Sequence, residues 1–176
     1  MTVVVLKAGD YQAYRALMLQ AYEFEPDAFT STRLERAGQP ADWWQNRLAN
    51  PDGLSVVFGT YLADKLVGSV ALEFSTKTKT RHKAHLLGMY VAPGARGSGA
   101  GRALLDACLA YLDQRREISS VTLTVTEGNE AALRLYRSVG FAEFGVEPMA
   151  VLLESGYRAK VHMWRAVGSH SGASES

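Results

Sequence analysis

The hydrophobic pattern of the chain alternates between short apolar runs and longer stretches whose apolar residues recur three and four positions apart. The short runs predict strands at 3–7, 55–62, 66–74, 84–91, 121–126 and 160–166, with one more strand beginning at Gly140-Phe141. The helical period predicts helices at 10–22, 40–48, 99–115 and 129–138. Residues 26–39 have poor periodicity, which predicts a loop with a short helix.

These elements follow one another without a repeat or a linker that would divide the chain. We therefore expect one α/β domain, residues 1–167, in which a single mixed sheet carries helices on both faces. Residues 168–176, GSHSGASES, are small and polar, and this composition predicts a disordered tail.

Composition and charge exclude several classes of protein. With 19 basic and 18 acidic residues, the chain has a formal net charge of +1, so no nucleic acid or anionic membrane is expected as a partner. The one cysteine, Cys108, excludes an intrachain disulfide. Only His82 and His85 lie close together among the four histidines, so no metal site is expected. No signal peptide and no run of ~18 apolar residues is found, which favours a cytoplasmic protein.

A glycine-rich turn between a predicted strand and a long amphipathic helix is the first candidate for chemistry. A helix N-terminus carries unpaired N–H groups and a partial positive charge, and glycines let the backbone approach a phosphate closely. The turn therefore predicts a pyrophosphate site at which two arginines neutralise charge. A glycine turn without a ligand is the alternative. The residues of the predicted site are Arg96, Gly97, Ser98, Gly99, Ala100, Gly101 and Arg102.

Two common phosphate motifs do not fit this turn. A P-loop requires lysine where the chain has Ala100, and a dinucleotide fingerprint requires glycine where it has Arg102. A third pattern, R-x-x-G-x-G, is matched by Arg96, Gly99 and Gly101, directly after a strand that ends in Tyr-Val-Ala-Pro.

In these residues the chain resembles the GNAT superfamily of N-acetyltransferases. The resemblance implies that the turn at 96–101 holds the pyrophosphate of coenzyme A. It also implies that backbone groups of Met89, Tyr90 and Val91, on the strand before the turn, contact the pantetheine arm.

A second candidate lies in the predicted helix 129–138. Asn129 and Tyr136 are seven residues apart, with Ala132 and Leu133 between them on the same helix face. This arrangement resembles the later motif of the same family. The resemblance implies that Asn129, Ala132 and Tyr136 contact the cofactor and that Tyr136 also protonates the departing thiolate. The alternative is that Asn129 only caps the helix and Tyr136 only packs.

The resemblance is continuous over residues 66–141 and implies the acyl-CoA N-acyltransferase (GNAT) fold. That fold has a mixed, mostly antiparallel sheet of about seven strands flanked by about four helices. The implied activity is transfer of an acetyl group from acetyl-CoA to a primary amine in a ternary complex. The acceptor is a small molecule or a peptide that the sequence does not identify, and we expect a monomer or a homodimer.

The base that removes the ammonium proton is open among Glu73, His85, Glu127 and a water relay. Two other functions compete with the acetyltransferase. A non-catalytic acyl-CoA-binding module of the same fold is disfavoured by the presence of both Asn129 and Tyr136. A nucleotide-dependent oxidoreductase is disfavoured because the third glycine of its fingerprint is missing.

Overall fold

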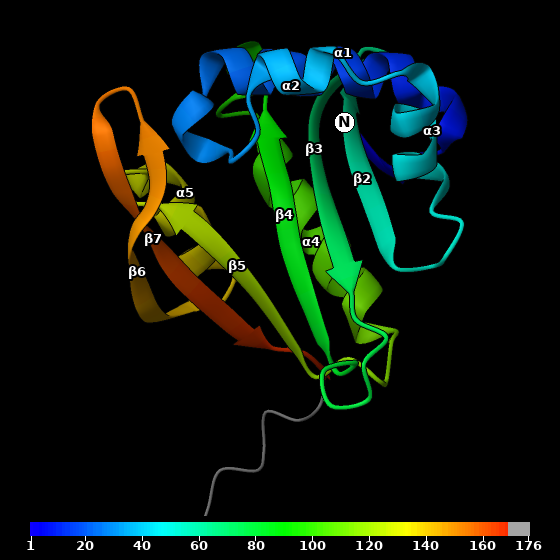
Figure 1. Cartoon of the computed structure of the whole chain (residues 1–176). Helices are drawn as coiled ribbons and strands as arrows, with labels where there is room; N and C mark the ends of the chain where they lie inside the picture. Colours follow the sequence, from blue (N-terminus) through cyan, green and yellow to red (C-terminus); the bar gives the residue numbers. More distant parts are fainter. Residues whose placement is uncertain (169–176) are drawn as a thin grey trace, which may run out of the picture.

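A computed structural model describes residues 1–168, and these form one mixed sheet of seven strands. The strand order is β1-β2-β3-β4-β5-β7-β6, and the paired strands are antiparallel except β4 and β5, which are parallel (Figure 1). The predicted central sheet is confirmed. Beyond Gly168, the predicted disordered tail falls outside the described residues. The strands are β1 (Thr2–Val5), β2 (Ser55–Leu62), β3 (Lys65–Phe74), β4 (Lys83–Val91), β5 (Ser120–Thr126), β6 (Ala142–Leu153) and β7 (Gly156–Ala166).

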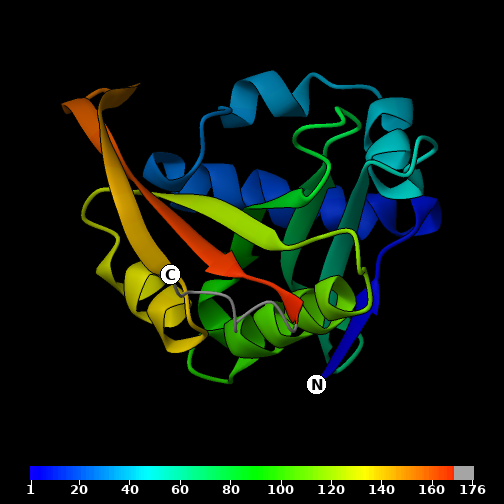
Figure 2. The same cartoon turned by 90° about the horizontal axis from the view of Figure 1, so that it is seen from below.

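Helices cover both faces of the sheet, so the molecule has three layers (Figure 2). One face carries α1 (Tyr11–Phe24), α2 (Arg33–Ala37) and α3 (Ala41–Ala49), and the other carries α4 (Ala100–Asp113) and α5 (Glu130–Ser138). Short 3-10 helices, η1 (Ala8–Asp10), η2 (Pro26–Ala28) and η3 (Pro93–Ala95), precede α1, α2 and α4.

The described residues thus contain five α-helices where the sequence predicts about four, because α2 lies in the segment expected to be a loop with a short helix. A capping box accounts for α2. Thr32 Oγ1 accepts a hydrogen bond from the N–H of Glu35, and the Glu35 carboxylate accepts one from the N–H of Thr32.

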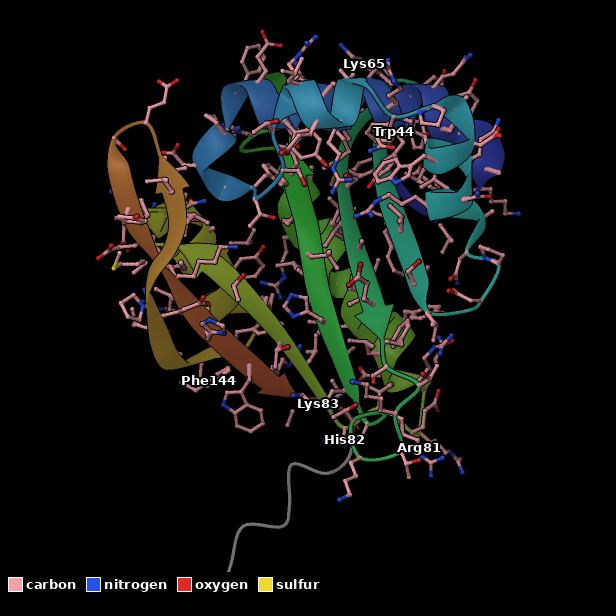
Figure 3. The ribbon with its side chains drawn as sticks, in the orientation of Figure 1. Trp44, Lys65, Arg81, His82, Lys83 and Phe144 are labelled. Carbon is pink, nitrogen blue, oxygen red and sulfur yellow. The ribbon has the colours of Figure 1, made fainter. Side chains whose placement is uncertain are left out.

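Each face of the sheet packs against its helices through a separate hydrophobic layer. On the α4 side, the buried stripe of α4 is the one that its period predicts: Leu104, Leu105, Cys108, Leu109 and Leu112. On the α1 side, Trp44 has an exposed fraction of 0% and lies between α3 and the sheet (Figure 3). Within residues 1–168, no helix is long and apolar enough to cross a membrane.

The last hairpin differs most from the predicted strand limits. β7 begins at Gly156, well before the predicted start at Lys160, because β6 continues to Leu153 and pairs with it there. β6 begins at Ala142, just after the predicted Phe141. The edge strand β6 is exposed over most of its length, so it lacks the apolar alternation that marks a half-buried strand.

The parallel strands β4 and β5 pair over only three residues and then separate. Residues Lys83–His85 pair with Ser120–Thr122, and beyond them the two strands diverge (Figure 1). A register shift against β3 places an extra residue in β4 at Gly88 and Met89, and Gly88 has a φ of 64°. Such a bulge bends its strand. The second half of β4 therefore has no neighbouring strand on the β5 side.

Candidate active site

The glycine-rich turn forms the N-terminus of α4, directly after β4 and η3. Gly97 and Gly99 have φ values of 78° and 86°, a left-handed backbone that residues with a Cβ rarely adopt. Gly101 permits close packing, because a Cβ there would lie 3.2 Å from Leu135 and 3.4 Å from Met89. The first N–H groups of α4 have no acceptor within the helix. The turn therefore presents backbone donors and a partial positive charge beside the unpaired end of β4.

Both arginines of the turn are engaged in ion pairs. Arg96 donates from Nη2 to Glu25 Oε1 at 2.6 Å and from Nε to the carbonyl of Val91 at 3.2 Å. Arg102 donates to Asp106 at 2.9 Å. Exposed pairs of this kind contribute only about 0–1 kcal/mol, so a phosphate can replace the carboxylates at little cost. Arg96 also ties the turn to the end of α1.

The strand residues predicted to contact pantetheine begin at the bulge of β4, which includes Met89, and continue through Tyr90 and Val91. Met89 and Val91 pack toward the α4 side of the sheet, whereas Tyr90 is buried on the α1 side. The carbonyl of Val91 already accepts the hydrogen bond from Arg96. The hydroxyl of Ser98 is likewise occupied, because it donates to the carbonyl of Ala95 at 2.6 Å.

Asn129, Ala132 and Tyr136 meet at a cavity of about 100 Å³, here named the central cavity. Asn129 caps α5, since its Oδ1 accepts a hydrogen bond from the N–H of Ala132 at 3.2 Å. Asn129 therefore fulfils the structural role that the sequence left as an alternative, and it also lines the cavity. The remaining lining residues come from β4, β5, α5 and the segment after α1: Ala28, Phe29, Leu86, Leu87, Gly88, Met89, Thr124, Val125, Thr126 and Leu135.

Tyr136 lines the central cavity and is otherwise buried, with an exposed fraction of 6%. Its ring packs edge-to-face on Phe141, with the ring centroids 5.9 Å apart. Burial raises the pKa of the phenol above its ordinary value, and the nearby Cys108 raises it further. The hydroxyl therefore keeps its proton at neutral pH, which is the form that a proton donor needs.

The three candidate bases lie in two different cavities. Glu73 and His85 line one of about 260 Å³, which has no lining residue in common with the central cavity. Glu127 lines one of about 310 Å³, here named the acidic cavity. The acidic cavity shares Ala28, Thr126 and Asn129 with the central cavity. Of the three candidates, only Glu127 lines a cavity that shares residues with the central cavity, on whose wall Tyr136 lies.

The half-buried imidazole of His85 makes the free energy of unfolding depend on pH. Burial lowers the pKa of its imidazole, an effect that Glu73 partly offsets, and its Nδ1 lies 3.0 Å from Thr122 Oγ1. Below the ordinary pKa of about 6.5, the unfolded chain binds a proton that the folded chain resists, so acid lowers the free energy of unfolding. We expect His85→Gln to lose less stability than the wild type between pH 7 and pH 5 in urea unfolding.

The matched control is His82→Gln, which changes an exposed histidine in the turn before β4 (Figure 3). This variant should lose as much stability on acidification as the wild type. Equal losses in all three proteins would show that the burial of His85 does not affect proton binding.

A large groove, about 750 Å³, adjoins both cavities on the α1 side. It lies between the segment from η2 to α2 and the hairpin of β6 and β7, and it shares Asp27 with the acidic cavity and Phe29 with the central cavity. Sequence reasoning missed this groove, because its walls come from two distant segments that match no motif. Its lining residues are Tyr22, Pro26, Asp27, Phe29, Thr30, Ser31, Thr32, Arg33, Ala150, Val151, Leu152, Leu153, Glu154 and Ser155.

Comparison with known proteins shows which family this chain is similar to. The profile described as the Acetyltransferase (GNAT) family matches residues 18–141. The mycothiol acetyltransferase of Salinispora tropica is 45% identical over 136 residues, which are 77% of this chain and 42% of that protein. The chain spans less than half the length of the curated mycothiol acetyltransferases that it matches.

Solved structures share the whole fold. The ribosomal-protein-alanine N-acetyltransferase of Brucella melitensis superposes with a TM-score of 0.77 at 25% identity, covering 95% of this chain and 100% of that one. The structure of yncA from Salmonella typhimurium, solved with its cofactor acetyl-CoA, has a TM-score of 0.77 at 18% identity and covers 100% of this chain and 99% of that one.

Proposed function

Because the chain belongs to the acetyltransferase (GNAT) family, we propose that it transfers the acetyl group of acetyl-CoA to the primary amine of an acceptor bound beside it. The observation that carries this proposal is the position of Tyr136. Its protonated phenol lies on the wall of the central cavity, which is also lined by β4 and β5, the two strands that separate. Met89, another lining residue, lies close to Gly101 at the start of α4, a helix N-terminus suited to phosphate. The acetyltransferases named above, and the neighbour that holds acetyl-CoA, support the same activity.

The residues of this chain fit acetyl-CoA. The free N–H groups at the start of α4 suit its pyrophosphate, and Gly97 and Gly99 keep side chains away from them. The unpaired edge of β4 offers backbone groups to the amides of the pantetheine arm. Asn129 and Ala132 line the cavity toward which that arm would extend. Bound in this way, acetyl-CoA would supply an acetyl thioester.

Two side chains would then handle the protons of the reaction. As the amine nitrogen bonds to the acetyl carbon and the C–S bond breaks, Tyr136 would give its phenolic proton to the sulfur, which keeps the electron pair. Glu127, directly or through a water molecule, would first pass one proton of the ammonium form to solvent and would then take the proton that the neutral amine loses as it is acetylated. Return of that proton to Tyr136 through solvent would complete the cycle. Holding the two reactants together supplies much of the acceleration.

A calorimetric titration with acetyl-CoA, beside ATP and NAD, tests the proposal. We expect acetyl-CoA alone to bind, and Arg96→Ala to weaken its binding, because a charge-assisted hydrogen bond to the pyrophosphate is lost. An assay of released thiol with a panel of primary amines then tests transfer. Binding of another nucleotide in place of acetyl-CoA would contradict the proposal. Binding without transfer to any amine would favour an acyl-CoA-binding module.

A further inference from the structure

The acidic cavity bears on which amine is acetylated. Its charged lining residues are the carboxylates of Glu25, Asp27 and Glu127 and the guanidinium of Arg158. Glu25 is held by Arg96 at 2.6 Å. Asp27, Glu127 and Arg158 form no salt bridge with any residue in the range 1–168. The cavity therefore offers two carboxylates and one guanidinium to a ligand.

A buried hydroxyl without a partner is the second feature of this cavity. Thr126 has an exposed fraction of 6% and lines both the acidic and the central cavity. Its Oγ1 is shielded from solvent and makes no hydrogen bond within the described part of the chain. A buried polar group left without a partner destabilises the folded chain. A ligand that donates a hydrogen bond to this oxygen removes that destabilisation.

The position of the acidic cavity links it to the proposed reaction. It shares Asp27 with the large groove and Ala28, Thr126 and Asn129 with the central cavity. The groove also shares Phe29 with the central cavity, so an acceptor that lies in the groove is next to both the free carboxylates and the cavity of Tyr136.

We propose that the acidic cavity is the subsite for the ammonium group of the acceptor, an inference that rests on the proposed function. Asp27 and Glu127 provide the countercharge, and Thr126 Oγ1 accepts one N–H hydrogen bond. Arg158 binds an oxygen close to the amine, because a guanidinium donates to carbonyl and carboxylate groups but repels a second cation. The acceptor class is accordingly α-aminoacyl: an amino acid, its amide, or the amino end of a peptide.

Two measurements with L-alaninamide test this subsite. Calorimetry on the protein loaded with coenzyme A gives the Kd of L-alaninamide, and acetyl transfer compares L-alaninamide with propylamine, which has no carbonyl. We expect Thr126→Val and Glu127→Gln each to raise the Kd about tenfold, the size of effect typical of a hydrogen bond to a charged group. Arg158→Gln should abolish a preference of about tenfold for L-alaninamide over propylamine.

Glu130→Gln is the matched control, because Glu130 lies on the first turn of α5 and lines neither the large groove nor the acidic or the central cavity. Its Kd for L-alaninamide should equal that of the wild type. The isosteric Thr126→Val should melt no lower than the wild type, because it removes a buried hydroxyl that has no partner, and this separates loss of binding from loss of folding.

Three outcomes would overturn the inference. An unchanged Kd in both Thr126→Val and Glu127→Gln, while the wild type transfers acetyl to an amine, would remove the subsite and leave the proposed activity in place. Faster acetylation of spermidine than of L-alaninamide would remove the α-aminoacyl class. If no amine is acetylated although acetyl-CoA binds, the proposed function itself fails, and the Kd values still decide whether the cavity binds an ammonium group.

Discussion

Tyr136→Phe is expected to lower the kcat of acetyl transfer about 10²-fold, while the Kd of acetyl-CoA stays unchanged. The substitution removes only the phenolic oxygen, and the remaining ring keeps its edge-to-face contact with Phe141. Without the phenol, the thiolate must leave unprotonated or take its proton from water. Steady-state kinetics with a fixed amine, together with calorimetry, measures both quantities.

The matched control is Tyr111→Phe, which removes a hydroxyl from α4 that accepts a hydrogen bond from Arg115 and lines none of the cavities near Tyr136. This variant should keep the wild-type kcat. Because burial raises the pKa of Tyr136, its ionisation should not limit the activity of the wild type up to pH 9. A Tyr136→Phe protein with full kcat would contradict the role of proton donor.

Gly99→Val is expected to raise the Kd of acetyl-CoA about tenfold or more. Gly99 has a φ of 86° at the N-cap of α4, and a left-handed backbone costs a residue with a Cβ roughly 1–2 kcal/mol, more if it is β-branched. The turn relieves this strain by rotating, and its N–H groups then no longer converge on one point. Since 1.4 kcal/mol corresponds to a factor of ten in Kd, relief of that strain accounts for the expected loss.

Gly94→Val is the control for the loss of affinity. Gly94 lies in η3 of the same loop and is not among the glycines with positive φ, and a Cβ at this position would meet no atom within 4 Å. Calorimetry should therefore give a Kd close to that of the wild type for Gly94→Val. Equal affinities for the two variants would show that the left-handed turn at Gly99 is not needed to bind acetyl-CoA.

Most elements of the fold follow from local signals. One signal is the apolar stripe of α4, which has the period of a helix. Another is the alternation of Val121, Leu123 and Val125 with threonines, which has the period of a strand. The structure buries the apolar side chains of both segments. The limits of β6 and β7 do not follow in this way, because an exposed edge strand has no buried face to impose a period.

The residues of the candidate site also fall into those that the sequence indicates and those that only the structure reveals. Gly97, Gly99 and Asn129 stand out in the sequence, because each has a residue type that its backbone conformation or cap position favours. Tyr136 stands out by its spacing of seven residues from Asn129 on one helix face. The ion pair between Arg96 and Glu25 joins segments that lie far apart along the chain, so no local pattern indicates it. No local pattern indicates a special role for Thr126 either, because in the sequence it is one of several threonines of a predicted strand.

The amino-acid sequence was sufficient to predict the order of the elements, the glycine-rich turn, and the helix that carries Asn129 and Tyr136. These depend on backbone conformation and on periods within single segments. The folded chain was needed to show that β4 and β5 separate after three paired residues and that Glu127, rather than Glu73 or His85, adjoins the cavity of Tyr136. Cavities and partnerless hydroxyl groups arise where distant segments pack, and that packing depends on long-range contacts that no single segment encodes.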